Sequence, residues 1–162
     1  MKLKLLLPFL FVIYSCAQDS SIDRDDLIEK AGAPLLNGLG SHSFTISSKV
    51  EGVQDYFNQG LIMAFAFNHA ESIRSFKAAQ KLDPNCAICF WGEALALGPN
   101  INVTSDGKAI MSPQERLDAF ERTNKAIALI ELASPKEKDF ILTLKSRYNG
   151  DVNSSRVPLD IA

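Results

Sequence analysis

The strongest constraint in this sequence is a series of helix-start signals spread along most of the chain. Each combines a residue that caps a helix N-terminus with glutamate three residues later, with proline in the first turn, or with both. The signals are Ser48 with Glu51, Asn68 with Glu71, Asp83-Pro84, Ser112-Pro113-Gln114-Glu115 and Ser134-Pro135-Lys136-Glu137. Such a series predicts helices joined by turns. Residues 43–47 are the single short candidate for a strand, so the sequence predicts an all-α fold.

Apolar residues recur at helical spacing after these signals. They predict helices over residues 48–67, 68–82, 84–97, 113–133 and 135–148, and a further short helix over residues 22–31. Residues 100–111 have no clear period and predict a loop. The predicted organisation is a leader at 1–15, an irregular segment at 16–47, a helix pair at 48–84, a second pair at 85–133 with an inserted loop at 98–112, and a further helix with an irregular end at 134–162. The chain ends without a cap or stop signal, which predicts a truncated chain or a fragment.

A repeat period of about 34 residues gives the helix pairs a register. With Pro84 as the closing proline, the first repeat starts at Val53. Small residues then let helices approach closely, and aromatic residues fill the space between them. Gln59 fits worst, because the repeat pattern has leucine there. The predicted packing positions are Tyr56, Gly60, Phe76, Ala79 and Pro84 in the first repeat, and Phe90, Trp91 and Ala94 in the second.

The stretch over residues 56–102 resembles a family of bacterial tetratricopeptide repeat (TPR) proteins whose biochemical role is unassigned. The resemblance covers about a third of the chain and implies a TPR-like α-solenoid of stacked helix pairs. It also implies a longer intact protein, and the loop at 98–112 makes the second repeat irregular. The motifs that carry the resemblance are Tyr56-Phe57, Gly60, Phe67-Asn68-His69, Ser75-Phe76, Asp83-Pro84, Cys86-Ala87, Trp91-Gly92 and Ala96-Leu97-Gly98-Pro99-Asn100.

The first 15 residues have the anatomy of an export signal. Lys2 and Lys4 precede an apolar run over residues 5–14, which is shorter than the roughly 20 residues that span a bilayer. Ile13-Tyr14-Ser15-Cys16 resembles a bacterial lipoprotein box, which implies lipid on Cys16 and a location at the membrane of the cell envelope. A plain secretory signal cut near Ala17 is the alternative, and both interpretations export the protein.

Cys86-Ala87-Ile88-Cys89 at a predicted helix start is the main candidate for chemistry, because a helix N-terminus favours a thiolate. Three interpretations stay open: packing of small buried residues, a disulfide or redox role, and a metal site that includes His69. His69 has an equally simple interpretation as a turn residue at the corner between two helices. His42 cannot be placed from the sequence. Phe90 stands where a haem-attachment motif has histidine, which argues against haem.

Charge and motif content argue against an enzyme and against nucleic acid as a partner. The net charge is −2, and it becomes about −4 without Lys2 and Lys4, so no basic face is expected. With two histidines and no phosphate-binding glycine loop, no catalytic set or cofactor site is readable.

The sequence therefore predicts a protein- or peptide-binding scaffold at the cell envelope, anchored by lipid and without a cofactor. One alternative is a lipoprotein that handles thiols or metals through Cys86 and Cys89. The other is a lipoprotein that binds a small ligand, which requires an aromatic-lined pocket that stays open. Phe65, Phe67, Phe90 and Trp91 are candidates to line it, although their helical spacing favours the core.

Overall fold

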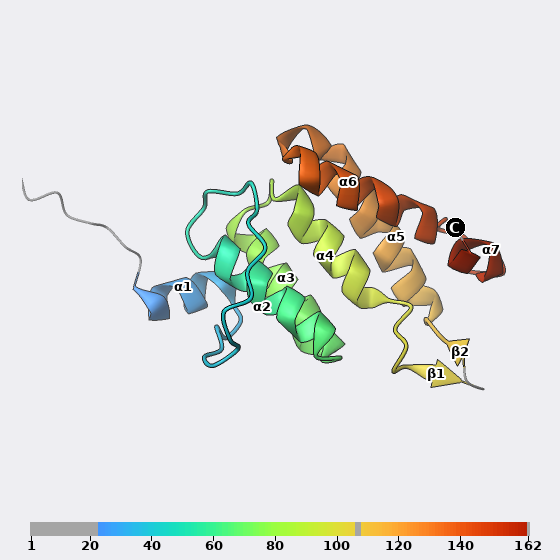
Figure 1. Ribbon diagram of the computed structural model, residues 1–162, viewed down its shortest axis with the longest axis horizontal. Coiled ribbons are helices and arrows are strands. Elements are labelled where there is room, and N and C mark those ends of the chain that lie inside the picture. Colours follow the sequence, from blue (N-terminus) through green and yellow to red (C-terminus); the bar gives the residue numbers. More distant parts are fainter. Residues whose placement is uncertain (1–22, 106–107, 162) are drawn as a thin grey trace, which may run out of the picture.

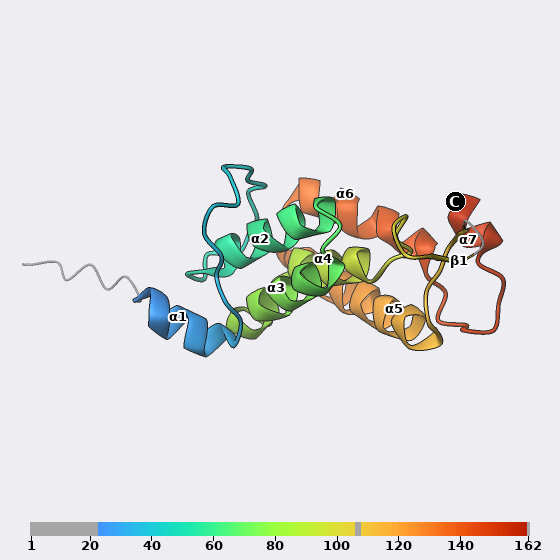
Figure 2. The ribbon, with the colours of Figure 1, turned by 90° about the horizontal axis from the view of Figure 1, so that it is seen from below.

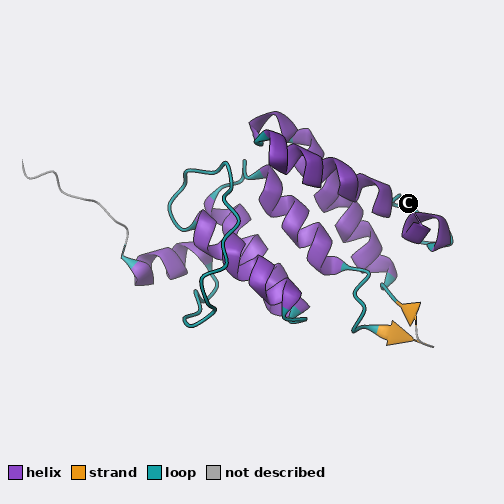
Figure 3. Ribbon diagram, viewed as in Figure 1, coloured by secondary structure: helices purple, strands orange, loops and turns teal. Residues whose placement is uncertain are grey.

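A computed structural model describes residues 23–105 and 108–161 of the chain. The predicted leader and the predicted lipidation site Cys16 lie outside these residues. In the described part, the regular structure is helical apart from one two-stranded hairpin, which confirms the predicted all-α class (Figure 3). The helices are α1 (Arg24–Ala31), α2 (Val53–Phe65), α3 (His69–Leu82), α4 (Ala87–Leu97), α5 (Pro113–Ala128), α6 (Pro135–Leu144) and α7 (Val157–Ile161).

Four smaller elements complete the described structure. Short 3₁₀ helices at Ile130–Leu132 and Lys145–Arg147 follow α5 and α6. Strands β1 (Thr104–Ser105) and β2 (Lys108–Ala109) pair antiparallel, with Thr104 opposite Ala109. This hairpin lies inside the segment that the sequence predicts to be a loop. Residues 43–47, the candidate strand, are not assigned to a strand in the structure.

The helices pack as successive antiparallel neighbours around α4, which contacts α2, α3, α5 and α6. Figure 1 shows α2, α4 and α6 side by side, and Figure 2 shows α3 and α5 on the opposite side of the molecule from α2 and α6. All residues of α4 except Leu95 and Leu97 are buried, as expected for a helix with neighbours on all sides. We call the side formed by α2, α4 and α6 the inner face.

Both Ser-Pro capping boxes form as the sequence predicts. Ser112 accepts a hydrogen bond from the Glu115 backbone N–H, and the Glu115 carboxylate accepts one from the Ser112 N–H. Ser134 and Glu137 repeat this arrangement at the start of α6. Asn68 also caps α3, as predicted. These signals succeed because every group that they need lies within four residues.

The predicted capping box at Ser48 is wrong. Helix α2 begins at Val53, and its N-cap is Gly52 in the left-handed region at φ 79°. A Cβ on residue 52 would also lie 2.4 Å from a Leu27 methyl, so a larger residue here would have to displace the Leu27 side chain. The Ser48 hydroxyl instead donates to the Asp83 carboxylate at 2.5 Å. This bond fixes the chain just before α2 to the turn between α3 and α4.

The predicted helix start at Asp83-Pro84 is also wrong. Asp83 ends α3, and its carboxylate accepts a hydrogen bond from the Asn85 backbone N–H at 2.9 Å. This turn delays the start of α4 to Ala87 and makes Cys86 its N-cap. Pro84 is exposed in the turn and does not pack as the repeat register predicts.

Phe76 is the centre of the contact between α2, α3 and α4. A Cβ on Gly60 would lie 2.9 Å from its ring, and one on Gly92 would lie 2.3 Å from it, so both neighbouring helices need glycine at the contact. The Ser72 hydroxyl donates to the Gly60 carbonyl at 2.7 Å and closes the same junction. The other predicted packing residues are also buried in the protein: Tyr56, Ala79, Phe90, Trp91 and Ala94.

Candidate functional site on the inner face

A stretch of the chain without helix or strand, residues 33–47, lies against α2 and reaches α6. We call it the 33–47 segment. Side-chain amides of α2 bind its backbone. Asn58 accepts from the Phe44 N–H at 3.1 Å, while Gln54 donates to the Phe44 carbonyl at 2.9 Å and accepts from the Ile46 N–H at 3.1 Å. These contacts supply, from one helix, the hydrogen bonds that a neighbouring strand would otherwise give.

Gln59 binds the first part of this segment in the same way. Its amide nitrogen donates to the Pro34 carbonyl at 3.0 Å, and its oxygen accepts from the Leu36 N–H at 2.7 Å. The residue is 2% exposed, so these bonds satisfy a buried amide. Gln59 departs from the repeat pattern because it binds main chain at a position where leucine would pack.

Tyr56 adds a third tie between α2 and the segment. Its hydroxyl donates to the Ala33 carbonyl at 2.6 Å, and its ring is fully buried. Burial raises the pKa of this phenol above 10.0, although the nearby charge of Arg24 acts in the opposite direction. The phenol therefore stays protonated and able to donate at neutral pH.

The far end of the segment is locked to α6 by Glu137. The carboxylate accepts hydrogen bonds from the Ser47 N–H at 2.9 Å, from the Ser47 hydroxyl and from the Ser134 N–H at 2.7 Å. Glu137 is 1% exposed. Burial alone would raise the pKa of Glu137, but the hydrogen bonds from Ser47 and Ser134 outweigh it and hold that pKa below 4.5.

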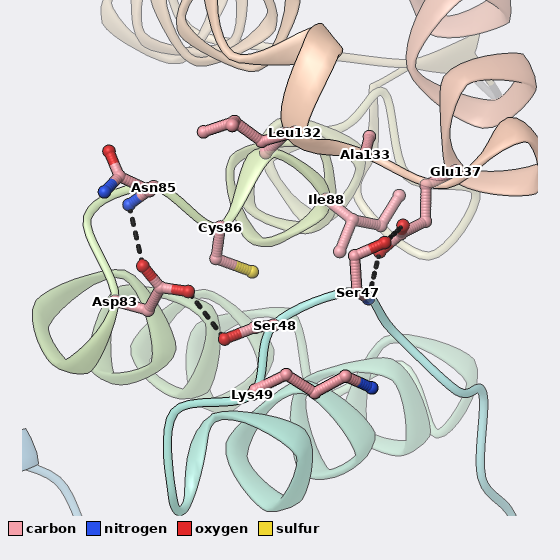
Figure 4. Close-up of a pocket in the computed structure, with 11 residues that line it drawn as sticks. Ser47, Ser48, Lys49, Asp83, Asn85, Cys86, Ile88, Leu132, Ala133 and Glu137 are labelled. Carbon is pink, nitrogen blue, oxygen red and sulfur yellow. Dashed lines mark hydrogen bonds between the residues drawn. The ribbon is translucent and has the colours of Figure 1, made fainter.

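A polar pocket of about 220 Å³ lies beside this lock (Figure 4). Figure 4 shows the Ser47–Glu137 and Ser48–Asp83 hydrogen bonds on its walls and the Cys86 sulfur directed toward its centre. Cys86 and Cys89 form a disulfide at the start of α4, and both residues are buried. We call this site the polar pocket.

The structure does not bring His69 to the cysteine pair. His69 begins α3 and Cys86 follows its end, so the 14-residue helix separates them by about 20 Å. The His69 ring lies 2.7 Å from the Asn102 side-chain oxygen, at the corner where α2 meets α3. Among the described residues, no three His, Cys, Asp or Glu side chains are grouped as metal ligands would be.

A second pocket on the inner face has the opposite chemistry. Its volume is about 420 Å³, and hydrocarbon side chains and the Trp91 indole make its walls apart from His42, which is exposed and therefore stands at the rim. We call it the apolar pocket. Its lining residues come from α2, α4, α6 and the 33–47 segment: His42, Phe44, Phe57, Leu61, Phe65, Trp91, Leu95 and Phe140.

The sequence predicts part of this pocket and not the rest. The candidate groove residues Phe65 and Trp91 line it, whereas Phe67 lies outside it and Phe90 packs in the core. Phe44 and Phe140 escape prediction, because they lie 96 residues apart and meet only through the fold, with ring centroids at 5.4 Å. The one available signal for Phe140 is an aromatic residue on the predicted last helix.

Comparisons with known proteins give no relative: no family model, curated protein or solved structure matches the chain. Within the described residues, no helix is long and apolar enough to cross a membrane.

Proposed function

We propose that the protein is a TPR-type helical-repeat scaffold that holds an extended segment of a partner protein on its inner face. The observation that carries this proposal is the binding of residues 33–47 by the amides of Gln54, Asn58 and Gln59. Recognition of this kind reads main-chain groups and therefore suits extended peptides of many sequences.

The geometry also offers a place for specificity. Extended peptides are selected by pockets that take individual side chains, while their backbone bonds supply affinity. On the inner face, Phe140 of α6 is partly exposed and contacts both Phe44 and Trp91, so its ring borders the apolar pocket. A partner segment that runs beside residues 33–47 would contact this ring.

The anchor in this proposal is lipid on Cys16, which would place the inner face at the membrane of the bacterial cell envelope. Metabolic labelling with an alkyne fatty acid tests this part separately. The expected result is label on the wild-type protein and none on Cys16→Ala; equal label on both would refute the anchor without affecting the scaffold.

The scaffold itself is tested with peptides. Random dodecapeptides are selected by display on the purified protein, and the recovered peptides are measured by fluorescence polarisation. We expect Phe140→Ala to weaken binding by about tenfold or more, because central aromatic residues dominate binding energy. Leu142→Ala is the matched control, since Leu142 is exposed on the same helix but lies outside the apolar pocket. Peptides that bind all three proteins equally would contradict the proposal.

A thiol-redox function is the second candidate, favoured by the position of Cys86 in the wall of the polar pocket. Equilibration with dithiothreitol, followed by thiol alkylation and mass measurement, gives the reduction potential. A redox protein should fall between about −120 and −270 mV, whereas a structural disulfide should lie below about −300 mV. A reduction potential below about −300 mV would refute the redox function.

A further inference from the structure

The apolar pocket borders the core, because Phe57, Leu61 and Trp91 both pack in the core and line the pocket. The Phe76 ring of α3 packs against Gly60 of α2 and Gly92 of α4 and so joins the three helices. The pocket is an opening of about 420 Å³ between α2, α4 and α6, within the size range of small-molecule sites. Phe65 borders it with 72% of its surface exposed, a large uncovered area for an aromatic side chain.

The walls of the pocket are held by hydrogen bonds with Gln54 and Asn58, which lie outside the lining, and by ring contacts among the lining residues themselves. The backbone of Phe44 is bound on both sides by Gln54 and Asn58, and its ring meets Phe140 edge-on. Phe140 also meets Trp91 edge-on, with ring centroids 5.4 Å apart. These rings are therefore fixed before any ligand arrives, and a ligand would not have to order them.

The chemistry of the walls selects the ligand. Among the described residues, no Asp, Glu, Lys or Arg side chain lines the pocket, so a buried charge on the ligand would have no partner. A cation is further disfavoured because the Lys136 ammonium already lies 4.1 Å from the Phe44 ring centroid. Aromatic walls favour the edge or face of another ring, and the imidazole of His42 at the rim offers one polar partner.

From this geometry we propose that the apolar pocket between α2, α4 and α6 binds a small, uncharged molecule that carries an aromatic ring. The ring lies among Phe44, Trp91 and Phe140, and any single polar group of the ligand lies toward His42. This site shares Phe140 with the surface that the scaffold proposal assigns to a partner segment, so the two ligands would compete, and the test below distinguishes them.

The test uses N-phenyl-1-naphthylamine, an uncharged fluorophore with a naphthalene and a phenyl ring, and the purified protein. Trp91 is the single tryptophan of the chain and lines the pocket, so energy transfer from it reports a probe bound there. We expect saturable transfer with one site per protein. Naphthalene should displace the probe, and naphthalene-2-sulfonate, its charged analogue, should be at least about tenfold weaker.

Phe65→Glu and Phe67→Glu form the matched pair of variants. Both side chains are more than half exposed and lie two residues apart, but only Phe65 lines the apolar pocket. Circular dichroism should show both variants folded, because neither side chain is part of the core. Phe65→Glu should raise the Kd of the probe by about tenfold or more, since it places a charge at the rim, and Phe67→Glu should change it less than about twofold.

Four results would overturn the proposal. The first three are no saturable transfer, equal loss of affinity in the two variants, and equal affinity for naphthalene and its sulfonate. Displacement of the probe by aromatic peptides but not by naphthalene would also overturn it. That result would assign the pocket to a partner's side chain and leave the scaffold proposal standing. Absence of peptide binding with naphthalene binding intact would instead refute the scaffold and support the small-molecule site.

Discussion

The polar pocket and the apolar pocket share three elements, the 33–47 segment, α4 and α6, but they use the segment in opposite ways. Around the polar pocket, Ser47, Ser48, Asp83 and Glu137 all have hydrogen-bond partners within the protein. Around the apolar pocket, aromatic carbon is left uncovered, and Phe65 is largely exposed. The segment is thus bound to α6 at Ser47 and lines an open cavity a few residues earlier, at His42 and Phe44.

The difference follows from the cost of leaving each kind of group unsatisfied. An unpaired buried polar group costs about 1–3 kcal/mol, so the groups at the segment's end must bond or stay in water. An open apolar pocket forfeits dispersion contacts, which is a smaller cost per atom and is recovered when a ligand fills it. The hydrogen bonds between Ser47 and Glu137 therefore hold the 33–47 segment in place where it lines the apolar pocket.

The largest expected effect comes from breaking the lock. Glu137→Ala removes the acceptor of the Ser47 N–H and hydroxyl and one of the two acceptors of the Ser134 N–H, whose other acceptor is the Ser47 hydroxyl. We expect the free energy of unfolding to fall by about 3 kcal/mol, because these groups are partly buried. Glu115→Ala is the control, because it removes the same capping-box carboxylate from an exposed position and should cost about 1 kcal/mol or less. Urea unfolding measures both. Equal losses would mean that the lock is no more than a helix cap.

The disulfide should contribute less. Cys86 and Cys89 close a very short loop, for which the loss of unfolded-state entropy predicts about 2 kcal/mol. The Cys86→Ala, Cys89→Ala double variant should show this loss in urea, and dithiothreitol should produce it in the wild-type protein but not in the variant. A wild-type protein that dithiothreitol does not affect would show that the bond adds no stability.

The hydrogen bond between Tyr148 and the C-terminal half of α4 should contribute less still to stability. The Tyr148 hydroxyl lies 2.7 Å from the Ala94 carbonyl and also contacts the Gly98 carbonyl, and burial raises the pKa of Tyr148 to about 12. Tyr148→Phe keeps the ring and removes the bond, so thermal unfolding should show a loss of about 1 kcal/mol. A loss as large as that of Glu137→Ala would mean that the polar pocket is not the main lock.

Titration of the lock should give the smallest effect, and its sign is fixed. Because the folded-state pKa of Glu137 lies below the 4.5 of a free carboxyl, its contribution is complete above that pH. The contribution is lost as the pH falls from 4.5 through the folded-state pKa. The stability difference between the wild-type protein and Glu137→Gln should therefore shrink below pH 4.5. A difference that stays constant would exclude the ionised carboxylate as the source of the lock.

How far the sequence predicts this structure depends on the range of each interaction. The boxes at Ser112 and Ser134 are local and form at the predicted residues, whereas Ser48 resembles a cap but bonds Asp83, 35 residues away. Gln59 fits the repeat pattern poorly because its amide binds the main chain of Pro34 and Leu36. The sequence does not predict this contact, since both partners belong to a segment with no recognisable pattern. From the sequence, an open aromatic pocket is only a condition that small-ligand binding would require. Its position cannot be predicted, because its walls come from four separated stretches of chain.

Methyl NMR tests most directly whether one end of the inner face is an open aromatic pocket. Naphthalene is titrated into the protein while the leucine methyl signals are followed. We expect the signals of Leu61 and Leu95, which line the apolar pocket, to shift and saturate together, while those of Leu27 and Leu144 in the core stay fixed. Shifts at none of these residues, or at all four alike, would show that the pocket is not an open binding site.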